Sequence, residues 1–132
     1  MTSKARSAKK DSAGSDRVEQ IIDALTITGM PKGMARTLAF LSTKDDWSTS
    51  KDIEEVTNLR QPEVSIAVRN LANRGWVEAD NLKRESKGRP IRIYRMAVEM
   101  SEVYKALEAS ERVKIADVEA NLKAIRDLWK VK

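Results

Sequence analysis

Hydrogen-bonding and cationic side chains gather in two clusters, one at residues 60–70 and one at residues 83–92. Arginine and glutamine in the first cluster can each form two hydrogen bonds with the edge of a purine base. The second cluster is mainly cationic, and guanidinium and ammonium groups bind anionic oxygens. Neither cluster pairs a nucleophile with a base. The spacing therefore predicts recognition of a polyanion and no enzyme activity.

The composition removes most catalytic and metal chemistry. None of the 132 residues is Cys or His, which excludes disulfides, thiolate metal sites, the commonest general base and the commonest metal ligand. We expect no catalytic residues, no metal and no cofactor. A carboxylate-only Mg²⁺ site stays open, although the acidic residues are scattered or paired with basic ones.

The hydropathy of the chain indicates a small cytoplasmic protein. Apolar residues make up 41% of the sequence, which is enough for one core. No apolar run approaches the roughly 18 residues of a membrane span, and no signal peptide is present. We therefore expect a cytoplasmic location and no membrane partner.

Positive charge is concentrated in one part of the chain. The net charge is +5, and residues 58–95 alone hold nine basic and four acidic side chains. Such a block is typical of a surface that binds nucleic acid. A solvated surface with an accidental excess of Lys and Arg is the alternative.

The order of predicted elements is that of a winged helix-turn-helix, a mainly α fold of the α+β kind. Helices are expected over residues 16–28, 31–42 and 50–57, with a turn at 57–60 and a further helix to Gly75. Trp47 is expected in a short edge strand, and strands starting at Trp76 and Ile91 enclose a loop from Asn81 to Pro90. The expected buried positions are Met34, Leu38, Leu41, Ile53, Val56, Leu59, Val64, Ala67, Val68 and Leu71.

The helix that follows the turn is the predicted recognition helix. Gln61 can pair with adenine and Arg69 with guanine, and Ser65 can contact a base or a phosphate. Ile66 suits a thymine methyl, unless the helix is rotated so that Ile66 is partly buried. Glu63 can accept from cytosine, or can simply favour the helix N-terminus. The predicted DNA-binding residues of this helix are Arg60, Gln61, Glu63, Ser65, Ile66, Arg69 and Asn70.

The predicted wing carries the second cluster. Gly88-Arg89-Pro90 is similar to the core of an AT-hook, in which an arginine enters a narrow minor groove. The predicted wing contacts are Lys83, Arg84, Lys87, Gly88, Arg89 and Arg92.

Residues 27–96 resemble the DNA-binding domains of archaeal and bacterial winged-helix regulators of the TrmB, MarR and ArsR kind. The resemblance lies in Gly29–Arg36, Leu59–Ser65, Leu71–Val77 and the wing's Gly88-Arg89-Pro90 with Tyr94. The TrmB-like branch and an archaeal origin are the favoured assignment. This implies duplex DNA binding as a dimer, without the sugar-binding domain of full-length TrmB proteins and without the metal or thiol sensors of the ArsR group.

Residues 97–132 contain no Gly and no Pro and are predicted to form one long helix. Its apolar positions recur in steps of three and four, with a stutter near Glu111. We expect the helix to pair with a second copy, although it could instead fold back on its own domain. The predicted dimerisation residues are Met100, Val103, Leu107, Ile115, Val118, Leu122, Ile125 and Trp129.

Three regions follow: a disordered basic tail at 1–15, a winged-helix domain at 16–96 and a dimerisation helix at 97–132. The leading hypothesis is a homodimeric, sequence-specific transcriptional regulator that binds double-stranded DNA. An architectural chromatin-type protein with low sequence specificity and a winged-helix adaptor that binds protein are the alternatives. The operator, the sign of regulation and any small-molecule effector are not predicted.

Overall fold

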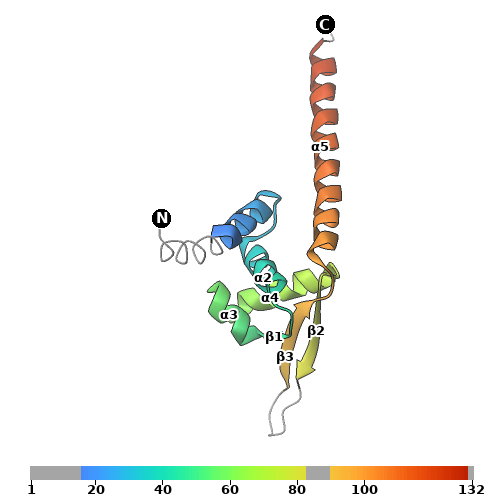
Figure 1. Cartoon of the computed structure of the whole chain (residues 1–132). Helices are drawn as coiled ribbons and strands as arrows, with labels where there is room; N and C mark the ends of the chain where they lie inside the picture. Colours follow the sequence, from blue (N-terminus) through green and yellow to red (C-terminus); the bar gives the residue numbers. More distant parts are fainter. Residues whose placement is uncertain (1–15, 83–89, 131–132) are drawn as a thin grey trace, which may run out of the picture. The chain divides into compact units, whose positions relative to one another are not determined.

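The computed structural model describes residues 16–82 and 90–130, in two compact units divided between Val98 and Glu99. The predicted tail at 1–15 and most of the predicted wing loop lie outside the described residues. The first unit is mainly helical with a small antiparallel sheet, as expected for a winged helix (Figure 1). In the described residues, no helix is both long and apolar enough to cross a membrane.

The core of the first unit comes from four helical segments. Residues 16–27 are helical and bury Ile22 and Leu25. Helix α2 (Lys32–Ser42) follows Pro31, whose fixed φ suits a helix start. Its predicted stripe is confirmed, because Met34, Leu38 and Leu41 are all buried.

Helix α3 (Ser50–Thr57) begins with a capping box. The Asp52 amide donates to the Thr49 hydroxyl at 3.0 Å, and the Thr49 amide donates to the Asp52 carboxylate at 3.0 Å. These bonds satisfy two amides that the helix itself leaves free. The cap of α3 is therefore Thr49.

The prediction that Val56 is buried is wrong. The buried residues of α3 are Ile53 and Thr57, and Val56 is 64% exposed. Residues four apart share a helix face, and the Thr57 hydroxyl can be buried because it donates to the Ile53 carbonyl at 2.6 Å. A polar residue with its own local partner thus takes the place that hydrophobicity assigned to Val56.

The turn leads into the predicted recognition helix, α4 (Gln61–Asn73). Asn58 ends α3 in the left-handed conformation at φ 63°. Leu59, predicted to be buried, is half-buried. Its methyl groups lie next to Gly33 of α2, since a β-carbon added to that glycine would be 3.8 Å from them. The predicted inner face of α4 is confirmed: Val64, Ala67, Val68 and Leu71 are buried against α2 and α3.

A three-stranded antiparallel sheet in the order β1-β3-β2 completes the unit. Strand β1 (Ser48–Thr49) follows Trp47 directly and pairs with β3 (Ile91–Met96). Strand β2 (Val77–Leu82) pairs with β3 from Val77–Met96 to Leu82–Ile91. The predicted loop therefore begins later than expected, because Asn81 and Leu82 continue the ladder. We call the β2–β3 hairpin the wing.

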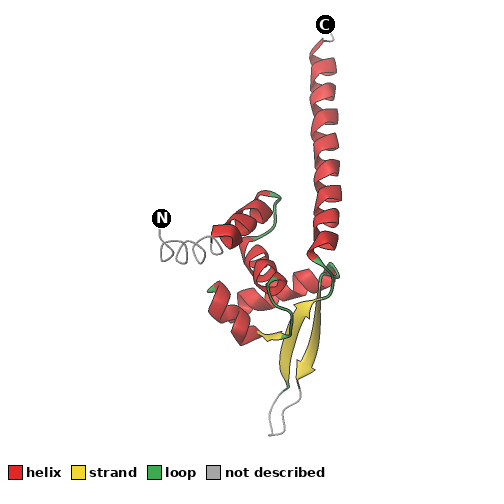
Figure 2. Ribbon diagram, in the orientation of Figure 1, coloured by secondary structure: helices red, strands yellow, loops and turns green. Residues whose placement is uncertain are grey.

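The second unit is a single helix, α5 (Met100–Lys130), drawn as one unbroken helix in Figure 2. Its 31 residues span about 46 Å. Pairs three or four residues apart support its surface, including Arg112 with Glu108 at 2.8 Å. The hydrogen bond and the charge of Glu108 raise the pKa of Arg112 above its ordinary value.

Candidate nucleic-acid interface

The outer face of α4 presents the predicted recognition residues to solvent. Arg60, Gln61, Glu63, Ile66 and Arg69 are exposed. The other two predicted residues, Ser65 and Asn70, are half-buried. Ile66 is 56% exposed, so α4 is not rotated in a way that would bury it.

The first turn of α4 uses one of these residues internally. The Arg60 amide donates to the Glu63 carboxylate at 2.8 Å, which satisfies a free amide at the helix start. The carboxylate also lies where the helix dipole favours negative charge. These two interactions account for a glutamate at position 63 without any contact to a base. Pairing of Glu63 with cytosine stays a prediction.

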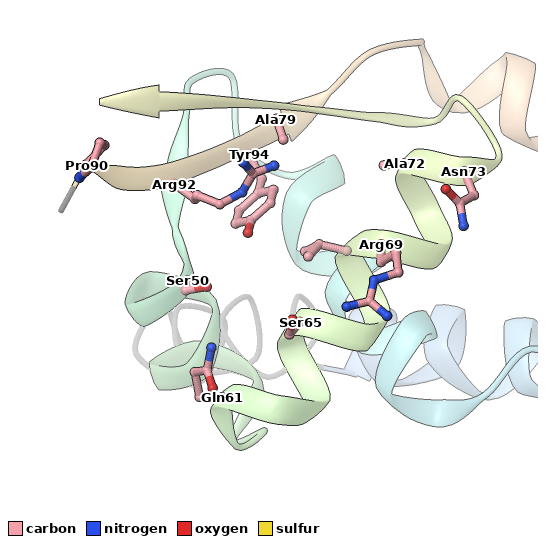
Figure 3. A pocket seen from close by; sticks show the side chains of 11 residues that line it. Ser50, Gln61, Ser65, Arg69, Ala72, Asn73, Ala79, Pro90, Arg92 and Tyr94 are labelled. Atoms are coloured by element: carbon pink, nitrogen blue, oxygen red, sulfur yellow. The ribbon is translucent and has the colours of Figure 1, made fainter. Parts of the chain in front are cut away.

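A groove of about 610 Å³ separates α4 from the wing (Figure 3). We call it the α4–wing groove. It brings Gln61, Ser65 and Arg69 of α4 together with Arg92 of β3. It does not include Arg60, Glu63, Ile66 or Asn70. The remaining lining residues are Ser50, Val68, Ala72, Asn73, Ala79, Pro90 and Tyr94.

The predicted wing contacts are only partly described. Arg92 lies exposed on β3, at the start of the wing's second strand. Lys83, Arg84, Lys87, Gly88 and Arg89 lie outside the described residues. Their roles stay predictions from the sequence.

Ser50 and Tyr94 are among the lining residues that were not predicted as site residues. Ser50 opens α3, and Tyr94 lies two residues after Arg92 on β3. The alternation of strand side chains puts Tyr94 on the same face as Arg92, which was the available signal. Tyr94 is only 7% exposed.

The groove is electrostatically positive. Arg69 and Arg92 line it, and none of the described residues that line it carries a carboxylate. Neither guanidinium forms an ion pair within the described parts of the chain, whereas the nearby Arg95 donates to Glu78 at 2.7 Å. An unpaired arginine beside a concave surface attracts anions because no local charge compensates it.

Comparison with known families shows a similarity in this unit. Residues 27–84 match the sequence model of the MarR family. These 58 of the 132 residues are similar to the winged-helix domain of that family. The match includes α2, α3, α4 and β2, and so covers the predicted recognition helix and one side of the α4–wing groove.

Solved structures share this fold. One is a possible transcriptional regulator from Methanosarcina mazei Go1, at 16% identity and a TM-score of 0.61, covering 81% of this chain and 87% of that one. Another is a transcriptional regulator at 17% identity and a TM-score of 0.54, covering 83% and 74%. A comparison with curated protein sequences gave no match.

Proposed function

We propose that this chain is a sequence-specific regulator of transcription that binds double-stranded DNA as a homodimer. In this proposal α4 enters the major groove, and the wing contacts the backbone and the minor groove. The observation that carries it is the α4–wing groove, which Arg69 and Arg92 line and to which the described part of the chain contributes no carboxylate. Proteins of the MarR family are DNA-binding transcriptional regulators, which supports the same reading.

The homodimer rests on the apolar stripe of α5. Of the predicted dimerisation residues, Val103 is buried and Leu107 is half-buried, whereas the other six are exposed. Leu122 is 60% exposed and Trp129 is 80% exposed. An apolar stripe repeating every three to four residues suits pairing with the same stripe of a second copy. Two copies of α4 would then lie about one DNA turn, roughly 10–10.5 bp, apart.

The proposal also covers the family branch, the location and the cofactors of the protein. The TrmB-like and archaeal assignments rest on the motifs of residues 27–96. The protein acts in the cytoplasm and is not an enzyme. It needs no metal and no cofactor.

Fluorescence anisotropy with labelled random duplex, at low and moderate salt, tests DNA binding directly. We expect affinity to fall steeply with salt, because binding releases counterions from phosphates. An adaptor that binds only protein would show no salt-sensitive binding. Selection of bound duplexes from a random pool then tests specificity: a two-fold symmetric motif supports the regulator, and the absence of any motif supports an architectural role.

The groove assignment is tested by Arg69→Gln with Lys123→Gln as the matched control. Each variant removes one positive charge, but Lys123 lies exposed on α5 in the other unit. Arg69→Gln should cost about 1–3 kcal/mol on the selected site and relax specificity at one base pair. Equal affinities of the two variants would show that the groove is misassigned.

A further inference from the structure

Tyr94 occupies a special position in the sheet. It lies on β3, the middle strand, opposite Ser48 of β1 and Ala79 of β2. Directly opposite residues of an antiparallel pair share a face, so the tyrosine ring has a small neighbour on each side. Ala79 and Tyr94 both line the α4–wing groove. The ring therefore projects between two short side chains into the groove.

The hydroxyl of Tyr94 is directed at open space. Figure 3 shows the ring extending from β3 toward α4, with its oxygen in the space between Ser50 and Ser65. No hydrogen bond joins this hydroxyl to another residue in the described ranges. Among the described residues, the side-chain oxygen that is both buried and without a hydrogen-bond partner is that of Ser48. The Tyr94 oxygen, which also lacks a partner there, is therefore not completely buried. The Tyr94 oxygen is thus reachable from the groove although only 7% of the residue is exposed.

Arg92 shares this side of the groove. Its guanidinium carbon lies 5.9 Å from the centroid of the Tyr94 ring, a distance suited to a cation–π contact. Ser50 supplies a second hydroxyl at the same edge. One guanidinium and two hydroxyl groups therefore line the same side of the groove, and the described lining holds no carboxylate that could occupy them.

We propose that Ser50, Arg92 and Tyr94 form a seat for one backbone phosphate of bound duplex DNA, with the Tyr94 hydroxyl as a direct donor. This inference rests on the proposed function. A phosphate offers acceptor oxygens and a negative charge, which match a guanidinium and neutral hydroxyl donors. Contacts to phosphates fix the register of a protein on the duplex and carry no sequence information. The seat positions the domain so that Arg69, across the groove, reaches the base edges.

The chain offers a matched pair of variants, because its two tyrosines are Tyr94 and Tyr104. Tyr94→Phe removes only the hydroxyl and keeps the ring that packs in the sheet and under Arg92. Tyr104→Phe makes the same change on α5, where Tyr104 is 63% exposed. Both full-length variants are measured by anisotropy on random duplex and on a duplex obtained by selection. Circular dichroism on heating confirms that each variant folds like the wild type.

We expect Tyr94→Phe to weaken binding about tenfold, by the same factor on both duplexes. Tyr104→Phe should bind like the wild type. The slope of log affinity against log salt should not change for Tyr94→Phe, since no charge is lost, but should fall by about one for Arg92→Gln. This split in salt dependence separates a hydroxyl donor from a charged one within the same seat.

The measurements distinguish a failure of the phosphate seat from a failure of the proposed function. Wild-type affinity in Tyr94→Phe, with salt-sensitive binding by the wild type, would overturn the seat and leave the proposed function standing. A loss confined to the selected duplex would also overturn it, because a base contact would then be responsible. If the wild type shows no salt-sensitive duplex binding, the proposed function fails and the seat fails with it.

Discussion

The guanidinium of Arg95 lies over the indole ring of Trp47, with 4.3 Å between the guanidinium carbon and the ring centroid. Arg95 also donates to the Glu78 carboxylate at 2.7 Å. Trp47 precedes β1, Arg95 lies on β3 and Glu78 lies on β2. The stack therefore connects all three strands on the sheet face that alternation places opposite Arg92 and Tyr94.

A double-mutant cycle of Trp47→Leu and Arg95→Gln should reveal this coupling. We expect each single variant to lower the free energy of unfolding, and the cycle to give a coupling of about 0.5–1 kcal/mol. Chemical denaturation monitored by circular dichroism measures it. Strictly additive effects would show that the stack contributes no energy of its own.

Ile53 and Val56 of α3 differ in burial, so substitutions at the two positions should differ in their effect on stability. Ile53→Ala should destabilise the fold by about 2–5 kcal/mol, because Ile53 is fully buried. Val56→Lys should change stability by no more than about 0.5 kcal/mol, because Val56 is mostly exposed. Thermal unfolding of the two variants distinguishes them, and a large loss in Val56→Lys would contradict the burial described for α3.

Asn58 holds the turn between α3 and α4 at a positive φ. Asn58→Gly should keep the wild-type stability within about 0.5 kcal/mol, since glycine adopts this conformation freely. Asn58→Val should cost about 1–2 kcal/mol, because a side chain with a branched β-carbon clashes there. Denaturant midpoints provide the comparison. Equal midpoints for the two variants would mean that the turn relaxes to another conformation.

Ile66 provides a test of base readout that does not involve charge. If its side chain contacts a thymine methyl, Ile66→Ser should weaken binding to the selected duplex by roughly 1 kcal/mol, about fivefold in Kd. Random duplex should be bound as before. Val56→Ser is the control, since Val56 is also exposed but lies on α3. An equal loss on both duplexes would argue against a specific apolar contact.

The stripe on α5 predicts how the oligomer can be broken. Leu122→Glu should weaken self-association by roughly 3–5 kcal/mol, because dimer formation would bury an unpaired charge. Lys123→Glu introduces the same side chain at the next position as a control, outside the predicted stripe. Light scattering coupled to size-exclusion chromatography reports the mass. A dimer that survives Leu122→Glu unchanged would place the interface elsewhere.

The parts of the fold that follow from periodicity were predictable from the sequence. The stripe of α2 and the inner face of α4 repeat every three to four residues, and both are buried as expected. The exposure of Val56 could not be predicted in this way, because a short helix has room for few buried positions. A threonine whose hydroxyl donates to a carbonyl of its own helix is as easily buried as a valine. The end of β2 was also misplaced, since Asn81 and Leu82 carry no clear alternation.

The site was predictable only where one element supplies it. The outer face of α4 follows from its inner face. Ser50 and Tyr94 reach the α4–wing groove from α3 and β3, so their place depends on how three elements pack. A tyrosine that is almost fully shielded is expected in a core, and sequence alone does not show where its hydroxyl points.

The β2–β3 ladder keeps one register over all six of its pairs, from Val77–Met96 to Leu82–Ile91, with no bulge. The register of the hairpin is therefore set by the pairing of its two strands and does not depend on the sequence of the loop that joins them. Residues added or removed between Leu82 and Ile91 leave Arg92 and Tyr94 on the groove side. The loop between the two strands can thus be replaced by another sequence, while Arg92 and Tyr94 keep their places in the α4–wing groove.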